Sequence, residues 1–130
     1  MIRNKDDETI EIFIDALPPT ANNIWRQNHR TGQTYLNPQY KNFREITALT
    51  VGRGRMPQNW KYCAVSITIF PRRRIGDADN RIKATLDALT YARFWPDDKV
   101  VAEVSARFGK VDKNGAVSIV VTKRDRKFED

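Results

Sequence analysis

The chain has 130 residues, of which 40% are hydrophobic and 30% charged, and this composition is typical of a folded globular protein rather than a disordered one. The length suits one domain with a single core, and the uncharged apolar run at residues 62–71 is too short to span a bilayer. One cysteine excludes an intrachain disulfide and a zinc site built from cysteines. The first eight residues are mostly polar and show no signal peptide, so we expect a cytoplasmic, intracellular protein with no membrane partner.

The charge is strongly positive and unevenly distributed. Lysine and arginine total 23 against 16 acidic residues, which gives a formal net charge of +7. Residues 1–20 hold two basic and five acidic side chains, whereas residues 21–60 hold six basic and one acidic. Such asymmetry favours binding to a polyanion, because each phosphate that a basic side chain neutralises releases condensed counterions.

Periodic apolar residues predict the secondary structure in chain order. We expect strands at residues 9–15, 62–70, 100–108 and 116–122, and helices at residues 38–52 and 79–91. A long polar loop should separate Pro18-Pro19 from about Asn37, and the last two strands should form a hairpin around Asn114-Gly115. We expect frayed termini at residues 1–8 and 123–130. The predicted class is mixed α/β (α+β), with one domain over residues 1–130 that packs two main helices on a small mixed sheet.

The most informative stretch is residues 72–83, Arg-Arg-Arg-Ile-Gly-Asp-Ala-Asp-Asn-Arg-Ile-Lys. On a helix, Asp79 and Lys83 are one turn apart and project together, and Asp77 lies close enough in sequence to converge on them. Oxygen ligands of this kind suit Mg²⁺, which needs few carboxylates and completes its shell with water and substrate phosphate. Asp98, after the next helix, is a candidate third ligand.

Two questions about these carboxylates stay open at this level. An aspartate at the start of a helix often only caps free backbone N–H groups, although Asp77, Asp79 and Asn80 are three candidates where one cap suffices. Asp98 reaches the Asp79 end only if its loop runs back along the helix; otherwise it completes a site across a subunit boundary.

Several other side chains have simpler expected roles. Cys63 shares an apolar strand face and should be an inert core residue. Phe94 and Trp95 should cover the core rather than stack on bases, whereas Trp25 and Tyr35, in the polar loop, are better stacking candidates. His29, the only histidine, is expected to be solvated in that loop.

Several motifs occur along the chain in a fixed order: Pro18-Pro19-Thr20 with Asn22, the run Arg72–Arg74, Asp77-x-Asp79-Asn80-x-x-Lys83, Asp87-Ala88-Leu89, Phe94-Trp95 and Asp97-Asp98. Together they give the chain a resemblance to the RusA family of Holliday junction resolvases. It covers about residues 10–122 in the expected order. Gly76 departs from the basic residue expected before the first aspartate, which leaves one phosphate contact without its usual residue.

The resemblance implies a RusA-like fold and a Mg²⁺-dependent, homodimeric endonuclease. Such an enzyme resolves four-way or other branched DNA by paired nicks in recombination and repair, without a small-molecule cofactor. The matching positions are Asp77, Asp79 and Asp98 as metal ligands, with Lys83 beside them as a catalytic residue. Whether one or two ions bind is open.

The basic residues complete the expected DNA interface. Charge and position point to Arg26, Arg30 and the three arginines Arg72, Arg73 and Arg74 as DNA-binding residues. Asn80, the amide beside Asp79, is also expected to bind DNA. The alternative function is a non-catalytic basic module that binds branched or single-stranded DNA, with its aspartates only capping a helix.

Overall fold

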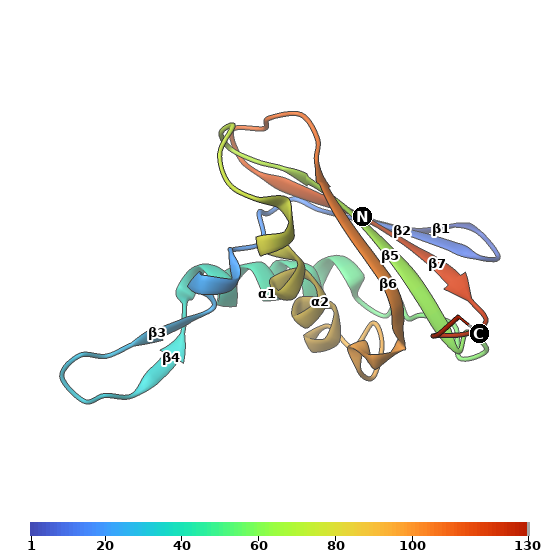
Figure 1. Ribbon diagram of the computed structural model, residues 1–130, viewed down its shortest axis with the longest axis horizontal. Coiled ribbons are helices and arrows are strands. Elements are labelled where there is room, and N and C mark those ends of the chain that lie inside the picture. The colour runs from blue at the N-terminus through green and yellow to red at the C-terminus, as the bar shows by residue number, and fades with distance from the viewer. Residues whose placement is uncertain (130) are drawn as a thin grey trace.

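A five-stranded sheet with two helices on one face forms the body of the protein, and a separate two-stranded ribbon projects from it (Figure 1). The structure is a computed structural model that describes residues 1–129. The strands are β1 (Ile2–Asp6), β2 (Thr9–Ile14), β3 (Trp25–Gln27), β4 (Thr34–Leu36), β5 (Tyr62–Phe70), β6 (Val101–Phe108) and β7 (Ala116–Arg124). The helices are α1 (Pro38–Val51) and α2 (Ile82–Tyr91), with 3₁₀ turns η1 (Ala21–Asn23), η2 (Ala78–Arg81) and η3 (Asp98–Val100). These elements confirm the predicted α/β class.

The order of the sheet is β1-β2-β7-β5-β6, and only the β5–β6 pair is parallel. Parallel neighbours need a crossover connection, and here α2 supplies it between β5 and β6. The carboxyl ends of both strands therefore lie at the same edge of the sheet, where Ile69 is opposite Phe108. The loops at residues 71–77 and 109–115 leave the sheet at this edge.

The core lies between the sheet and the two helices. Alternate residues of the three central strands are buried against them: Ile10, Ile12, Ile14, Cys63, Val65, Ile67, Ile69, Val117, Ile119 and Val121. Phe43 of α1, Leu89 of α2 and the ring of Trp95 fill the space opposite these strands. Trp95 satisfies its only polar atom, because Nε1 donates to Thr90 Oγ1 at 2.7 Å. The expectation that Phe94 and Trp95 are core residues is confirmed, since both are 1% exposed.

Local sequence signals set the bounds of α1. Asn37 caps the helix, since its Oδ1 accepts from the backbone N–H of Gln39 at 2.9 Å, and Pro38 occupies the first helical position. Gly52 ends it with a φ of +54°, which a residue with a side chain rarely adopts. The predicted helix at residues 38–52 and the predicted strands at 9–15 and 62–70 are confirmed within one residue.

The expected hairpin between residues 100–108 and 116–122 is wrong. Strand β5 lies between β6 and β7, pairing in parallel with the first and antiparallel with the second. The connecting segment passes over the end of β5, where Gly109 N–H donates to Ile69 O and Asp112 N–H to Pro71 O. The Asn114-Gly115 signal is a real turn, with Gly115 at a φ of +76°, but it belongs to this connection rather than to a two-residue hairpin.

Two segments expected to be irregular are ordered. The loop predicted between Pro18 and Asn37 contains the β3–β4 ribbon, in which Arg26 pairs with Tyr35. Residues 1–8, expected to fray, contain β1, which pairs with β2 at the edge of the sheet. Strand β1 is mostly polar or charged, and β3 and β4 have only three residues each, so apolar alternation gave no signal for either pairing. Among residues 1–129, no helix has the length and apolar character needed to cross a bilayer.

Cys63 provides a test of how tightly this core is closed. Burial raises the pKa of its thiol to about 12, so almost no thiolate is present at about pH 8. We expect the native protein to react with a thiol-specific disulfide reagent slower by roughly three orders of magnitude than the guanidinium-unfolded chain, whose thiol has an ordinary pKa. Rapid labelling of the native protein would contradict the closed core around β5.

Candidate functional site

The candidate site begins where the chain leaves the carboxyl end of β5 and enters η2. Asp77 has an extended backbone (φ −114°, ψ 134°) at the position before η2, and its side chain makes no capping hydrogen bond. The residue before α2 is Arg81, whose side chain does not cap that helix either. Asp77 and Asp79 are both exposed. The capping interpretation therefore has no support here, and both carboxylates remain available to bind a ligand.

The start of the second helix differs from the prediction. We expected one helix from Asp79 to Tyr91, but η2 carries Asp79 and α2 begins at Ile82. Asp79 thus lies in a 3₁₀ turn and Lys83 in an α-helix, and these two differ in pitch. The expectation that both side chains project together, which assumed one continuous α-helix, therefore does not apply. Lys83 Nζ instead lies 3.6 Å from Asp87 Oδ2. This pair is partly exposed and contributes roughly a few tenths of a kcal/mol to stability.

Asp98 lies beside α2, near Lys83 and Asp87. Burial raises the pKa of the Asp98 carboxyl, and the hydrogen bond to Asp97 and the negative charges of Asp97 and Asp87 raise it further, whereas Lys83 lowers it. The neighbouring Asp97 has a lowered pKa, chiefly because its Oδ1 accepts from the backbone N–H of Lys99 at 2.9 Å. Carboxyl groups from the end of one loop and the middle of α2 therefore share one region of the surface.

The three predicted metal ligands do not form a closed metal cage within this chain. Across residues 1–129, no group of three or more histidine, cysteine, aspartate or glutamate side chains is close enough together to hold a metal ion. Asp77 and Asp79 still fit a hard ion of the Mg²⁺ type, because such an ion takes one or two protein carboxylates and fills the remaining positions with water and phosphate oxygens.

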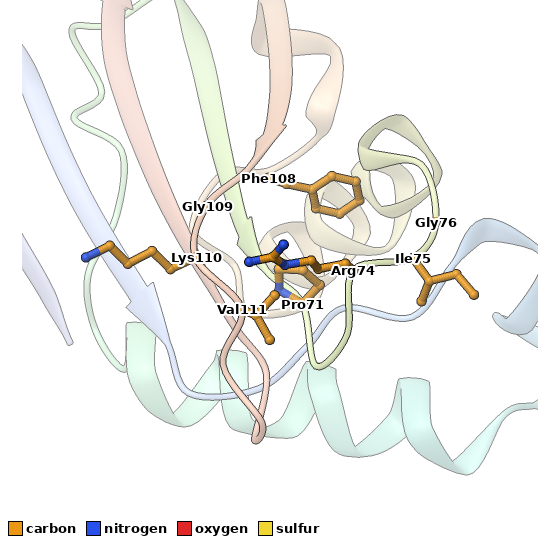
Figure 2. A pocket seen from close by; sticks show the side chains of 8 residues that line it. All are labelled: Pro71, Arg74, Ile75, Gly76, Phe108, Gly109, Lys110 and Val111. Atoms are coloured by element: carbon orange, nitrogen blue, oxygen red, sulfur yellow. The ribbon is translucent and has the colours of Figure 1, made fainter.

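The three consecutive arginines diverge after β5. Arg74 lines a pocket of about 640 Å³ at the carboxyl ends of β5 and β6, formed with Pro71, Ile75, Gly76 and residues 108–111. In Figure 2 the Arg74 side chain extends toward the 109–111 segment, while Ile75 and Lys110 point away on opposite sides. Arg72 belongs to a different pocket, and its Nε donates to Asn114 O at 3.5 Å. The run therefore presents positive charge on two sides of the loop that leads to Asp77.

The β3–β4 ribbon carries the aromatic and basic residues expected to meet DNA. Trp25 is 59% exposed and Tyr35 45% exposed. Tyr35 is opposite Arg26 in the ribbon and Trp25 is opposite Leu36, so the two rings lie on opposite faces. Arg26, His29 and Arg30 are all exposed on the ribbon or its turn. The ribbon projects away from the sheet, as Figure 1 shows at its left.

Sequence reasoning overlooked two residues near the site. For Asp87, the spacing of four from Lys83 predicts only an exposed ion pair and gives no sign that this carboxylate lies close to Asp98. Arg81 was given no role, and the structure places it half-buried against the segment that follows β2. No local pattern distinguishes Arg81 from a solvated arginine, because its neighbours are remote in sequence.

The placement of Asp98 can be tested through its ionisation. Asp87→Asn removes a like charge and should lower the pKa of the Asp98 carboxyl, whereas Lys83→Met removes an opposite charge and should raise it. Carboxyl ¹³C NMR titration measures both changes. Lys110→Met, at the far end of β6, is the charge-matched control and should leave this pKa unchanged. If neither α2 variant moved it, Asp98 would lie elsewhere.

The chain is also similar in sequence to proteins of a known family. The family model described as endodeoxyribonuclease RusA matches residues 16–122. A crossover junction endodeoxyribonuclease rusA of Enterobacteria phage 82 is 33% identical over 108 residues, which cover 81% of this chain and 88% of the relative. Crossover junction endodeoxyribonuclease RusA proteins of Escherichia coli K12 and Shigella sonnei are each 32% identical over the same shares of both chains. This chain therefore belongs to the RusA endodeoxyribonuclease family.

Proposed function

We propose that this protein is a Mg²⁺-dependent, structure-selective endodeoxyribonuclease that resolves Holliday junctions by paired nicks during recombination and repair. The observation that carries the proposal is a pair of exposed carboxylates, those of Asp77 and Asp79. Asp77 makes no capping hydrogen bond and lies three residues after the run of three arginines. Negative charge in a DNA-binding surface weakens binding unless a cation offsets it, so this combination favours catalysis over binding alone. The names of the relatives, all crossover junction endodeoxyribonucleases, support the same substrate class.

The proposed ligands of the metal are Asp77 and Asp79, joined by Asp98. A bound Mg²⁺ would polarise the scissile phosphate as a Lewis acid and lower the pKa of a water molecule bound to it. The remaining work falls to the chain itself. Lys83 is exposed in the first turn of α2 and offers a positive charge for the phosphate as negative charge develops on it. Asp87, one turn further along, forms a partly exposed ion pair with the Lys83 ammonium.

The basic side chains around these carboxylates form the proposed DNA path. Arg73, Arg74 and Asn80 are exposed on the loop and turn that flank Asp77. Arg26 and Arg30 extend the path onto the β3–β4 ribbon, where Trp25 offers an exposed ring for stacking on an unpaired base. A four-way junction, whose arms diverge from one point, fits a protein with basic groups on both the body and a projecting ribbon.

A homodimer follows from the symmetry of the substrate. A four-way junction has a two-fold axis, and its separation into two duplexes needs nicks in two strands related by that axis. One chain carries a single Asp77–Asp79 pair and hence makes one cut. A C2 dimer places two such pairs about the axis of the DNA, and it also offers Asp98 of one subunit the chance to complete the site of the other.

The carboxylates provide the main test. Asp77→Asn or Asp79→Asn should reduce nicking of a labelled four-way junction to the level seen with EDTA, while junction binding stays intact or tightens because negative charge near phosphate is lost. Asp7→Asn, an exposed site in the β1–β2 turn, is the matched control and should cut normally. Wild-type rates in either site variant would disprove the assignment. A wild-type protein that binds junctions with Mg²⁺ but never nicks them would instead favour the non-catalytic module.

The assembly is tested separately. Sedimentation equilibrium at micromolar protein should give a mass of about 30 kDa, twice the 15.1 kDa of one chain. A mixed dimer with one Asp79→Asn subunit should nick one strand but rarely release both duplexes. A monomer that releases both duplex products in one binding event would overturn the dimer.

A further inference from the structure

A second basic site lies on the other side of the loop that carries the arginines. It is a pocket of about 190 Å³ between the segment after β2, the first half of α1 and η2. Its walls hold two guanidinium groups, a hydroxyl and several side-chain amides, from Leu17, Pro19, Thr20, Asn23, Gln39, Asn42, Phe43, Arg72 and Arg81. No carboxylate is among these lining residues. A pocket of this size is smaller than those that take drug-sized ligands and suits a single small polar group.

Arg81 is held in this pocket by the backbone. Its Nη1 donates to the carbonyl of Pro18, a bond that spans 63 residues of sequence. Among residues 1–129, neither Arg81 nor Arg72 forms an ion pair with an acidic side chain. Burial and the positive charge of Arg72 lower the pKa of Arg81. Two arginines are therefore close together, one of them half-buried, and the protein itself does not neutralise them.

The amino end of α1 adds to this positive field. Gln39 and Asn42 line the pocket from the first turns of this 14-residue helix, and its first turn carries no acidic residue. Pro38 has no N–H and the Gln39 N–H donates to Asn37, so this end of the helix acts on an anion through the partial positive charge of the helix dipole. On the opposite wall, Asn23 Nδ2 donates to Thr20 Oγ1 at 3.1 Å, which fixes the amide beside the pocket.

A purely structural role explains this arrangement poorly. A guanidinium has five N–H donors, and the bond to Pro18 uses one of them. A neutral donor would tie η2 to this segment without the cost of bringing a second arginine near a half-buried positive charge. The planar fork of donors matches the oxygens of a phosphate group, which binds arginine through paired hydrogen bonds.

We propose that this pocket binds a phosphate of the DNA backbone other than the one that is cut. Arg81 and Arg72 are its charged ligands, Asn42 and Gln39 its neutral ones. Because η2 carries both Arg81 and Asp79, a phosphate held here fixes the position of the same strand relative to the proposed metal ligands. This inference rests on the proposed function for the identity of the polymer, and it gives the Pro18-Pro19-Thr20 motif a role as the wall that anchors Arg81.

The first experiment removes the positive charge of Arg81. Arg81→Gln should weaken binding to a four-way junction, measured in Ca²⁺ to prevent cutting, by about tenfold, as expected for one charge-assisted contact. The slope of log K against log[salt] should fall by about 0.9, one phosphate contact. Arg53→Gln, an exposed arginine beyond the opposite end of α1, is the charge-matched control and should change neither quantity. An unchanged slope for Arg81→Gln would overturn the proposal.

A second variant keeps the test valid if Arg81→Gln folds poorly. Asn42→Asp places a carboxylate in the pocket, where it should neutralise the arginines, raise Tm and weaken junction binding together. Asn59→Asp, exposed in the loop after α1, is the control for charge alone. A variant with raised Tm and undiminished junction binding would show that the arginines serve only the fold, and would overturn the proposal.

NMR of the Arg81 Nε–H group identifies the source of the phosphate. The signal should shift with a four-nucleotide single strand, and more weakly with inorganic phosphate. A shift with inorganic phosphate alone would mean a free-anion site and overturn the DNA assignment. Nicking by the wild-type protein is scored independently. If the wild-type protein nicks junctions and Arg81→Gln leaves junction binding and its salt slope unchanged, only the phosphate pocket is refuted. If Arg81→Gln weakens junction binding but the wild-type protein never nicks, only the proposed nuclease activity is refuted.

Discussion

The parallel pairing of β5 with β6 is the constraint on which the rest of the structure depends. Because two parallel neighbours cannot be joined by a tight turn, the chain must leave β5, cross the face of the sheet as α2 and return. This crossover places residues 71–83 and residues 109–115 at one edge of the sheet. It also brings the end of the return loop, with Asp98, against the side of α2. The candidate site is built from the two ends of this one crossover.

Charges of opposite sign are separated around η2 rather than paired. Asp77 and Asp79 have no arginine partner in an ion pair within residues 1–129, although three arginines precede them and Arg81 follows. A protein stabilised by its own electrostatics would pair these groups. Their separation is instead consistent with a substrate that carries negative phosphates and brings a cation with it, since that substrate satisfies both signs at once.

The metal site proposed for Asp77 and Asp79 is open, and this has a physical consequence. A closed cage of three or more carboxylates would bind an ion without DNA, whereas an ion held by two exposed carboxylates would take most of its ligands from water and phosphate. Binding of the ion and of the DNA would then depend on each other. In the proposed dimer, a third carboxylate from the return loop adds a further requirement, because the site is complete only when the subunits and the junction are correctly assembled.

The sequence by itself determined the elements that depend on neighbouring residues. The periodic apolar residues predict helix α1 and strands β2 and β5, and Asn37 and Gly52 mark the two ends of α1. The stretch of acidic and basic residues at 72–83 is also visible in the sequence alone. Only the tertiary structure decided that β5 separates β6 from β7, that residues 25–27 and 34–36 pair as the β3–β4 ribbon, and that Asp98 lies near Asp87. Distant segments compete for the same backbone donors and acceptors when strands pair, so the order of strands is decided by the whole chain. The environment of Arg81 likewise depends on Pro18, 63 residues away. No local pattern encodes either of these outcomes.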